Sequence, residues 1–319
     1  MSETSPSTHV YDFAIVGGGA AGFSAGLYAA RYLMDTVLFE GEFGGETATA
    51  STIENWPGSK AIDGYDLMVN MREQVKALDV NIIPELIFGV ERDGDIFVLK
   101  SATQEVRAKT MLLAIGAARR KLGLPEEDRL RGKGISYCTT CDSPLYKGKR
   151  VAVVGGGDAS IKGVNMLAKF AQEIFVLVRK DTLRAEPINQ DLLKKNQERM
   201  ALHLLYETEV KEIHGDEKLK SLTLSRPYEG STELAVDGLM IEIGAQPIRE
   251  LPQSIGVELD DMGFIKTDGM MRTNVAGVTA AGDCTNLFGH FKQDITASCE
   301  GAVAATAAHE FLQKLHAAA

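Results

Sequence analysis

The sequence predicts an α/β fold built from two Rossmann-like nucleotide-binding domains of the three-layer ββα type, the second inserted into the first. A glycine-rich strand–turn–helix–strand pattern begins at Tyr11 and is repeated at Lys149. Two segments punctuated by Pro and Gly, near Arg119 and Pro247, are the expected crossings between domains. Two crossings imply an insertion, so the predicted domains are residues 1–118 with 249–319, and residues 119–248.

Composition narrows the class of protein before any motif is considered. With 319 residues, 45% of them hydrophobic, the chain is long enough for two domains with their own cores. A net charge of −10 argues against nucleic acid or an anionic membrane as the main partner. Four cysteines are too few for a disulfide scaffold, so a cytoplasmic, reducing compartment is expected. The first residues lack the features of a secretion signal and are expected to form a disordered lead-in.

The first copy of the repeat, YDFAIVGGGAAGFSAGLYAARYLMDTVLFEGE, contains G-x-G-x-x-G directly after a strand-like run. Gly17 permits the tight turn, Gly19 lets the backbone approach a pyrophosphate, and Gly22 lets helix and strand pack closely. Glu40 follows the next strand about 20 residues later, the spacing of a ribose-binding carboxylate. This copy therefore predicts a site for a dinucleotide with an unphosphorylated adenosine ribose, rather than a glycine turn with a solvated glutamate.

The second copy, KRVAVVGGGDASIKGVNMLAKFAQEIFVLVRK, reads G-x-G-x-x-S, with Gly155, Gly157 and Ser160 in the three positions. When Gly17 is aligned with Gly155, Val178 takes the place of Glu40. No carboxylate stands there, and the residues that follow are basic: Arg179, Lys180 and Arg184. Cations neutralise a 2′-phosphate, so the turn indicates NADPH, although a solvated basic turn has the same composition. Two unlike dinucleotide sites imply a flavin and a nicotinamide that exchange hydride.

The remaining elements follow from period-two and period-3.6 patterns. Strand-like runs lie between the copies, in NIIPELIFGVERDGDIFVLKS and TMLLAIGAARR, and after the second copy, in KSLTLSRPYEGSTELAVDGLMIEIGAQP. An extended run, FIKTDGMMRTNVAGVTAAGDC, precedes the last predicted element. From Gln293 onward the pattern predicts a helix with small residues on one face.

A C-x-x-C pair, Cys138 and Cys141, stands just before the second fingerprint. It could supply half of a metal site, two buried thiols or a redox dithiol. Metal is disfavoured because Cys284 and Cys299 form no second C-x-x-C and no histidine lies near Cys138 in sequence. We expect no metal, and we expect Cys284 and Cys299 to be packing residues.

Asp142 directly follows the second cysteine of the pair. As an acid or base it could move the proton of a leaving thiolate. It could equally be the N-cap of a helix or a turn residue.

These residues resemble the low-molecular-weight, bacterial- and archaeal-type thioredoxin reductases of the pyridine nucleotide-disulfide oxidoreductase superfamily. The likeness runs from about Tyr11 to Leu315 and rests on ordered motifs: GGGAAG, STIENWPG, CTTCD, GGGDAS, VRKDTLRAE, AGD and KQDIT. It implies a homodimer whose larger domain holds FAD and whose inserted domain holds NADPH and the disulfide. The implied reaction passes electrons from NADPH through FAD and the disulfide to thioredoxin or a thioredoxin-like protein.

The resemblance also implies roles for individual residues. Cys141 is the flavin-proximal thiol, Cys138 attacks the partner disulfide and Asp142 donates the proton. Further residues match positions that bind FAD: Gly45, Asn55, Gly116, Asp283 and Gln293. The family alternates between two arrangements by rotating the NADPH domain, so short hinge-like crossings are expected.

Several positions depart from the family pattern. Val178 stands where relatives usually have histidine, and Ile161-Lys162-Gly163 occupies the stretch in which a pair of glutamates is common. Glu46 and Asp294 are expected to add negative charge beside the flavin, although Asp294 could instead be a helix N-cap. These departures leave open an electron donor other than NADPH, either ferredoxin or a second flavin. A flavin-bearing redox sensor without turnover is the remaining alternative.

Overall fold

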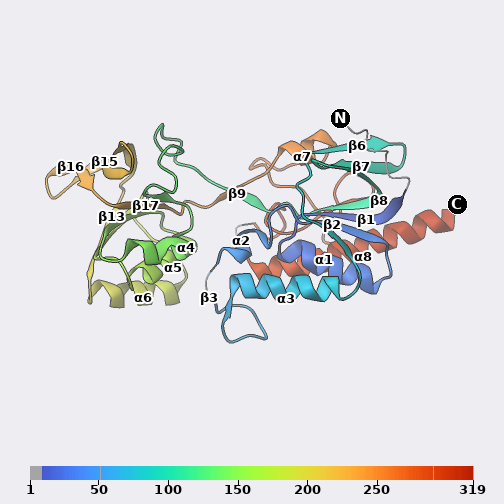
Figure 1. The fold of residues 1–319 in the computed structure, drawn as a ribbon, viewed down its shortest axis with the longest axis horizontal. Coiled ribbons are helices and arrows are strands. Elements are labelled where there is room, and N and C mark those ends of the chain that lie inside the picture. The colour runs from blue at the N-terminus through green and yellow to red at the C-terminus, as the bar shows by residue number, and fades with distance from the viewer. Residues whose placement is uncertain (1–8, 51, 290, 319) are drawn as a thin grey trace. The chain divides into compact units, whose positions relative to one another are not determined.

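The computed structural model describes residues 9–50, 52–289 and 291–318, so residues 1–8 of the predicted disordered lead-in lie outside the described residues, and the strand that follows begins at Val10. The chain divides into two compact units (Figure 1). One contains the chain up to Ala118 together with the chain from Pro247 onward, and the other contains Arg119–Gln246. Each unit is described separately.

The first unit is built on a seven-stranded sheet in which β8 is the central, longest strand. The parallel strands are β1 (Val10–Val16), β2 (Thr36–Phe39), β5 (Asn81–Ile83), β8 (Glu105–Leu113) and β19 (Val278–Ala280). The antiparallel strands are β6 (Gly89–Asp93) and β7 (Ile96–Lys100). The first half of β8 pairs with β7 and its last residues pair with β19, so one strand joins both parts of the sheet.

Alternation along β1 separates the two cores of this unit. Phe13 and Ile15 belong to the core shared with the helices, whereas Ala14 and Val16 face the core that includes β6 and β7 residues. Figure 1 shows the long helices of this unit together on one side of the sheet. They are α1 (Ala20–Arg31), α3 (Gly64–Lys76) and α8 (Asp294–Ala318). The small-residue helix predicted from Gln293 is therefore confirmed as α8.

The second unit has a five-stranded parallel sheet in the order β10-β17-β11-β12-β13. The strands are β10 (Ile135–Ser136), β11 (Arg150–Val154), β12 (Glu173–Val178), β13 (Ala201–Tyr206) and β17 (Gly238–Ile241). Its helices are α4 (Thr139–Asp142), α5 (Asp158–Leu167) and α6 (Pro187–Gln197). A separate antiparallel sheet contains β14 (Val210–Gly215), β15 (Leu219–Tyr228) and β16 (Ser231–Ala235).

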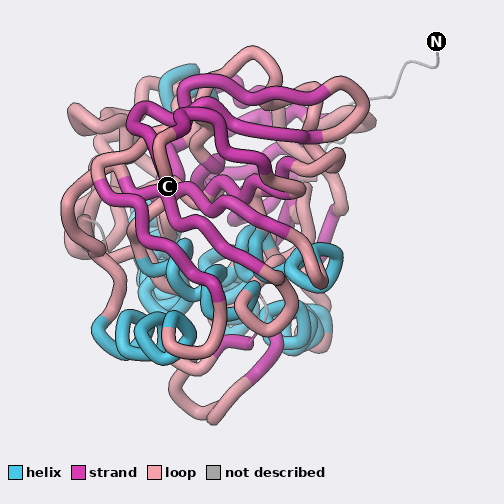
Figure 2. Tube along the Cα trace, turned by 90° about the vertical axis from the view of Figure 1, so that its left-hand side faces the viewer, coloured by secondary structure: helices cyan, strands magenta, loops and turns pink. Residues whose placement is uncertain are grey.

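The same alternation operates in β11. Val151 and Val153 pack with α5 and α6 residues, whereas Ala152 and Val154 pack with residues of the antiparallel sheet. Figure 2 distinguishes the helices (cyan) from the strands (magenta). The ββα layering is confirmed, and so is the repeat, because β1-α1-β2 corresponds to β11-α5-β12.

Short elements complete the chain. In the first unit these are α2 (Gly45–Ala48), β3 (Thr52–Ile53), β4 (Ile62–Asp63) and α7 (Glu250–Ser254). The second unit adds the 3-10 helix η1 (Ser143–Tyr146). The crossings contain β9 (Ala117–Arg119) and β18 (Ala245–Pro247), which pair as a two-stranded ribbon.

A buried carboxylate ties the first crossing to the strand that leads to the C-x-x-C motif. Glu127 is only 1% exposed and accepts hydrogen bonds from the backbone N–H groups of Leu122, Gly123 and Leu124. It also accepts a 2.6 Å hydrogen bond from the hydroxyl of Tyr137. Burial, and then the Glu127 carboxylate, raise the pKa of Tyr137 well above its usual range, so the hydroxyl remains a donor.

We expect Tyr137→Phe to lower the free energy of unfolding by about 2 kcal/mol, because it removes a buried hydrogen bond to a carboxylate. Urea denaturation followed by circular dichroism measures the change. Tyr228→Phe is the control, since its hydroxyl makes a longer, 3.3 Å contact with His203. Equal stabilities for Tyr137→Phe and the parent protein would contradict this account.

Candidate functional site

In the first unit the predicted site residues follow the carboxyl ends of neighbouring parallel strands. Gly17 follows β1, Glu40 follows β2, Gly116 lies just beyond β8, and Asp283 lies just beyond β19. Ligands of open α/β sheets bind at this edge, because the loops that leave the strands there face one another. The topology therefore brings together residues that are far apart in sequence.

The first glycine turn has the close packing that its sequence predicts. Gly17 has φ +121°, and a Cβ there would lie 2.1 Å from the carbonyl oxygen of Ala114. A Cβ on Gly22 would lie 1.8 Å from the carbonyl oxygen of Gly17. Gly19 is different: a Cβ there would meet only the Gly44 oxygen, at 3.9 Å. Gly19 is also the N-cap of α1 without a side-chain cap, so the helix N-terminus is open to a phosphate.

Glu40 is buried beside this turn, with 4% of its surface exposed. Its Oε2 accepts a 2.8 Å hydrogen bond from Arg72, but its Oε1 has no partner among the described residues. Burial raises the pKa of Glu40, and the Arg72 charge opposes that shift. A buried acceptor without a partner is rare, and a ribose hydroxyl supplies the donor that is lacking.

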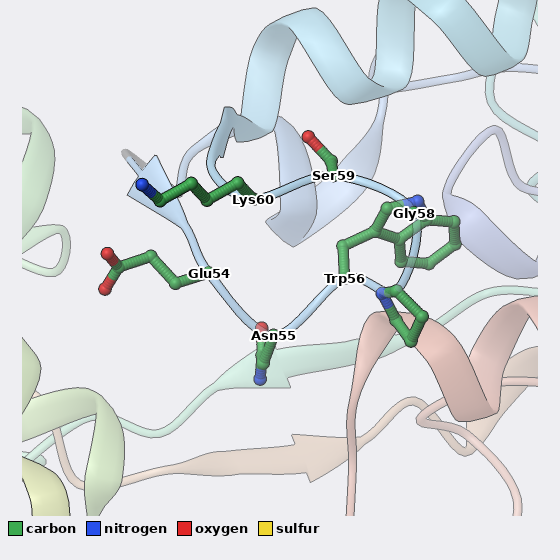
Figure 3. A pocket seen from close by; sticks show the side chains of 7 residues that line it. Glu54, Asn55, Trp56, Gly58, Ser59 and Lys60 are labelled. Atoms are coloured by element: carbon green, nitrogen blue, oxygen red, sulfur yellow. The ribbon is translucent and has the colours of Figure 1, made fainter.

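The loop between β3 and β4 forms another part of the site. Residues Glu54–Lys60 line a pocket of about 480 Å³ (Figure 3). In Figure 3, Asn55 projects to the side of the loop opposite Ser59. Its amide donates a 2.8 Å hydrogen bond to Gln293, just before α8, so these two predicted FAD residues meet.

Several acidic side chains lie near one another at Asp283. Burial raises the pKa of Asp283, Lys292 opposes the shift, and the charges of Asp294 and Glu46 add to it. Asp294, at the start of α8, accepts a 2.5 Å hydrogen bond from the Thr47 hydroxyl. The charges of Glu46 and Asp294 therefore both disfavour ionisation of Asp283. That these two charges lie beside the flavin stays a prediction.

The predicted FAD residues of this unit fit a dinucleotide. Gly45 lies against the first glycine turn, since a Cβ on Gly45 would be 3.8 Å from the Cα of Gly19. The chemistry present is an open glycine turn, an unpartnered acceptor oxygen on Glu40 and the Asn55–Gln293 amide pair, which are the groups that could hold a pyrophosphate, a ribose and a polar ring edge.

The second unit has a matching turn at the end of β11. Gly155 has φ +140°, and a Cβ there would lie 2.2 Å from the carbonyl oxygen of Glu242. Gly157 is the N-cap of α5, and the position that a Cβ would occupy on it has nothing within 4 Å. Ser160 replaces the third glycine and donates a 2.9 Å hydrogen bond to the Gly155 oxygen. The serine therefore closes the turn through its hydroxyl, and the phosphate-facing side stays open.

The basic turn lies beside these glycines. The backbone N–H of Arg184 donates a 2.7 Å hydrogen bond to the Gly156 oxygen. Arg179, Lys180 and Arg184 are all exposed. Among the ion pairs of the described residues, none involves these three side chains. The cations are thus available to a phosphate on a ribose bound at the turn.

The C-x-x-C motif leaves β10 at the same edge of this sheet. Cys138 is half-buried and disulfide-bonded, the oxidised state that the redox-dithiol interpretation requires. The side chain of Cys141 lies outside the part of the structure that is described. Asp142 ends α4 and is the N-cap of η1, but its side chain makes no capping hydrogen bond. Asp142 thus has the N-cap position without the N-cap function.

The two other cysteines differ from each other. Cys284 is buried, and burial raises the pKa of its thiol to about 12, so it is an inert packing residue as predicted. Cys299 is exposed on α8, so the prediction that it packs in the interior is wrong. A cysteine among small residues of a helix does not reveal which face it occupies.

Sequence reasoning missed one buried acid, Glu300, and one cation, Arg72, in the first unit. Glu300 is 4% exposed and accepts hydrogen bonds from the Gly282 N–H (2.6 Å) and the Thr285 hydroxyl (3.0 Å), which fixes the turn before Asp283. Arg72, the partner of Glu40, was also missed. The sequence did contain a signal for Glu300: it is the single acid within the small-residue run SCEGAVAA, where a carboxylate on the packed face of the helix needs a hydrogen-bond partner.

Comparison with known proteins adds independent information. A family profile described as pyridine nucleotide-disulphide oxidoreductase matches residues 11–308. The thioredoxin reductase of Streptomyces clavuligerus is 39% identical over 307 residues, which is 94% of each chain. The crystal structure of Lactococcus lactis thioredoxin reductase is 34% identical and matches with a TM-score of 0.89, over 95% of this chain and 99% of that one. The T. acidophilum thioredoxin reductase structure is 31% identical, with a TM-score of 0.86 over 94% and 98%.

We expect Glu40→Ala to weaken retention of the first dinucleotide by about tenfold or more, because one hydrogen bond from the ribose to a carboxylate contributes about 1.5–3 kcal/mol. The ratio of flavin to protein absorbance after dialysis measures retention. Glu73→Ala, an exposed carboxylate on α3, is the control. If Glu40→Ala keeps flavin as well as the control does, the assignment of the ribose site fails.

Proposed function

The chain belongs to the pyridine nucleotide-disulphide oxidoreductase family and, within it, to the FAD-dependent thioredoxin reductases; on this premise we propose which residues carry the reaction. It is a flavoprotein disulfide oxidoreductase that uses FAD and NADPH, with thioredoxin as its substrate. The observation that carries the proposal is that the C-x-x-C motif and the second glycine turn leave one parallel sheet at the same edge. The inserted unit therefore combines the disulfide with the expected NADPH turn.

FAD is proposed to bind the first unit. The chemistry that FAD supplies when bound is the transfer of two electrons from NADPH to a disulfide. Gly19 and the N-terminus of α1 would hold the pyrophosphate, Glu40 would accept a hydrogen bond from a ribose hydroxyl, and Asp283 would bind the ribityl hydroxyls. The full set of proposed FAD residues is Gly17, Gly19, Gly22, Glu40, Gly45, Asn55, Gly116, Asp283 and Gln293.

Cys138 and Cys141 are proposed to relay the electrons. The disulfide would take up two electrons, which come from NADPH through FAD, and two protons, to give two thiols. The Cys138 thiolate would then attack the thioredoxin disulfide to form a mixed disulfide, and Cys141 would break it, which releases reduced thioredoxin and re-forms the Cys138–Cys141 disulfide. Asp142 is the proposed proton donor and acceptor for this step. Its side chain is not used for capping, so it remains available to exchange a proton.

NADPH is proposed to bind the second unit at Gly155, Gly157 and Ser160. Arg179, Lys180 and Arg184 then neutralise the 2′-phosphate. A donor such as ferredoxin or a second flavin would leave three exposed cations beside an open glycine turn without a ligand, and this alternative is not favoured.

The wider setting is proposed as follows. The enzyme acts as a homodimer in the cytoplasm, on thioredoxin or a thioredoxin-like protein, and not on nucleic acid or membranes. The net charge of −10 and the small number of cysteines support this setting. Among the described helices, none is long and apolar enough to cross a bilayer.

Cys138→Ser is expected to keep reduction of the flavin by NADPH but to lower turnover of thioredoxin by about a thousandfold or more, because the attacking thiolate is removed. Anaerobic flavin bleaching and a coupled thioredoxin assay measure the two steps. Cys299→Ser, which removes an exposed free thiol, is the matched control and should retain turnover. Substantial turnover by Cys138→Ser would refute the role.

Arg184→Ala is expected to raise KM for NADPH about tenfold and to leave KM for NADH unchanged, since only NADPH carries the 2′-phosphate. Steady-state kinetics with both nucleotides measure the difference. Arg226→Ala is the control, because Arg226 lies in the same unit but pairs with Glu207. An equal rise in both KM values would show that Arg184 does not read the phosphate.

A further inference from the structure

Glu242 lies directly after β17 and contacts the residue next to the redox cysteine. Its Oε1 accepts a 3.0 Å hydrogen bond from the backbone N–H of Thr139 and a 2.9 Å hydrogen bond from the Thr139 hydroxyl. Thr139 is fully buried and begins α4, one residue after Cys138. The first turn of the redox motif is therefore hydrogen-bonded to the carboxylate of Glu242, the residue that follows the neighbouring strand β17.

Helix α5 leaves room for this contact only because residue 163 is glycine. A Cβ on Gly163 would lie 2.7 Å from the Thr139 Cβ and 2.9 Å from its Cγ2, closer than real side chains approach. Any larger residue at this position would displace Thr139 from Glu242. Gly163 on α5 and Glu242, directly after β17, thus both limit the position of Thr139.

We propose that Glu242 is a positioning residue for the redox disulfide and that it restrains loss of the proton from the reduced Cys138 thiol. Two effects act in the same direction. The Thr139 N–H is committed to Glu242, so it does not stabilise a neighbouring thiolate, and the carboxylate places a negative charge against the residue that follows Cys138. The inference rests on the proposed function of Cys138 and refines it.

The proposed restraint has a chemical consequence for the enzyme. A thiolate is the reactive form of cysteine, so a thiol that keeps its proton reacts slowly with chance disulfides and oxidants. Cys138 then needs a base at the moment of attack, and Asp142 at the end of α4 is the proposed base.

Helix α5 and η1 contact α4, and the charged groups on these two elements are the same in every variant that is compared. On α5, Lys162 and Asp158 form a 2.9 Å ion pair. On η1, burial and then the Asp142 charge raise the pKa of Tyr146 to about 12. Glu242 is the carboxylate that follows β17, and a change at this residue alone isolates its effect.

The test measures the pH midpoint at which iodoacetamide alkylates Cys138 in the FAD-loaded protein. A Cys141→Ser background keeps the remaining thiol out of a disulfide, and mass spectrometry of the Cys138 peptide separates it from the exposed Cys299. Glu242→Gln keeps an acceptor for Thr139 but removes the charge, and we expect it to lower the midpoint by about one pH unit. Gly163→Ala should lower the midpoint too, by displacing Thr139.

The matched control is Glu233→Gln, the same change in a carboxylate that accepts a 2.8 Å hydrogen bond from Ser221 in the antiparallel sheet. It should leave the midpoint unchanged. An unchanged or higher midpoint in Glu242→Gln, or an equal shift in the control, overturns the inference. None of these measurements depends on turnover. If Cys138 does not attack thioredoxin, the Cys138→Ser thioredoxin assay shows it, whereas the alkylation midpoint tests only the effect of Glu242.

Discussion

The arrangement of the site depends on the direction of the strands in each parallel sheet. Strands that run the same way end at one edge, and the loops leaving that edge must lie side by side. In the first unit this places Glu40 and Asp283 on the same side as the glycine turn. In the second unit it places Cys138 on the same side as Gly155, although the strand between them, β17, comes much later in the chain.

The sequence alone predicts those helices and strands whose residue pattern is local and strong. Glycine spacing and β-branched runs predict β1-α1-β2 and β11-α5-β12, and the structure has both. Glu40 was found because its distance from Gly19 is set by the length of one helix and one strand. The redox motif was found because two cysteines in one helical turn are a local feature, whatever surrounds them.

The remaining residues act through contacts between distant segments, which a local pattern does not encode. Arg72 reaches Glu40 from α3, and Glu300 reaches the Gly282 turn from α8. Glu127 collects four donors because its loop folds back on itself. The wrong prediction for Cys299 has the same origin, since a helix made of small residues shows weak contrast between its buried and exposed faces.

Gly163 couples the sequence of the nucleotide-binding helix to the sequence of the redox segment, so substitutions in the two are not independent. The helix that carries the nicotinamide-side glycine turn is the same helix against which Thr139 packs. Replacing α5 with a helix that has a larger residue at this position would bring a side chain into the space that Thr139 occupies. A redesign of the nucleotide site that replaces α5 therefore has to replace Thr139 and Glu242 at the same time.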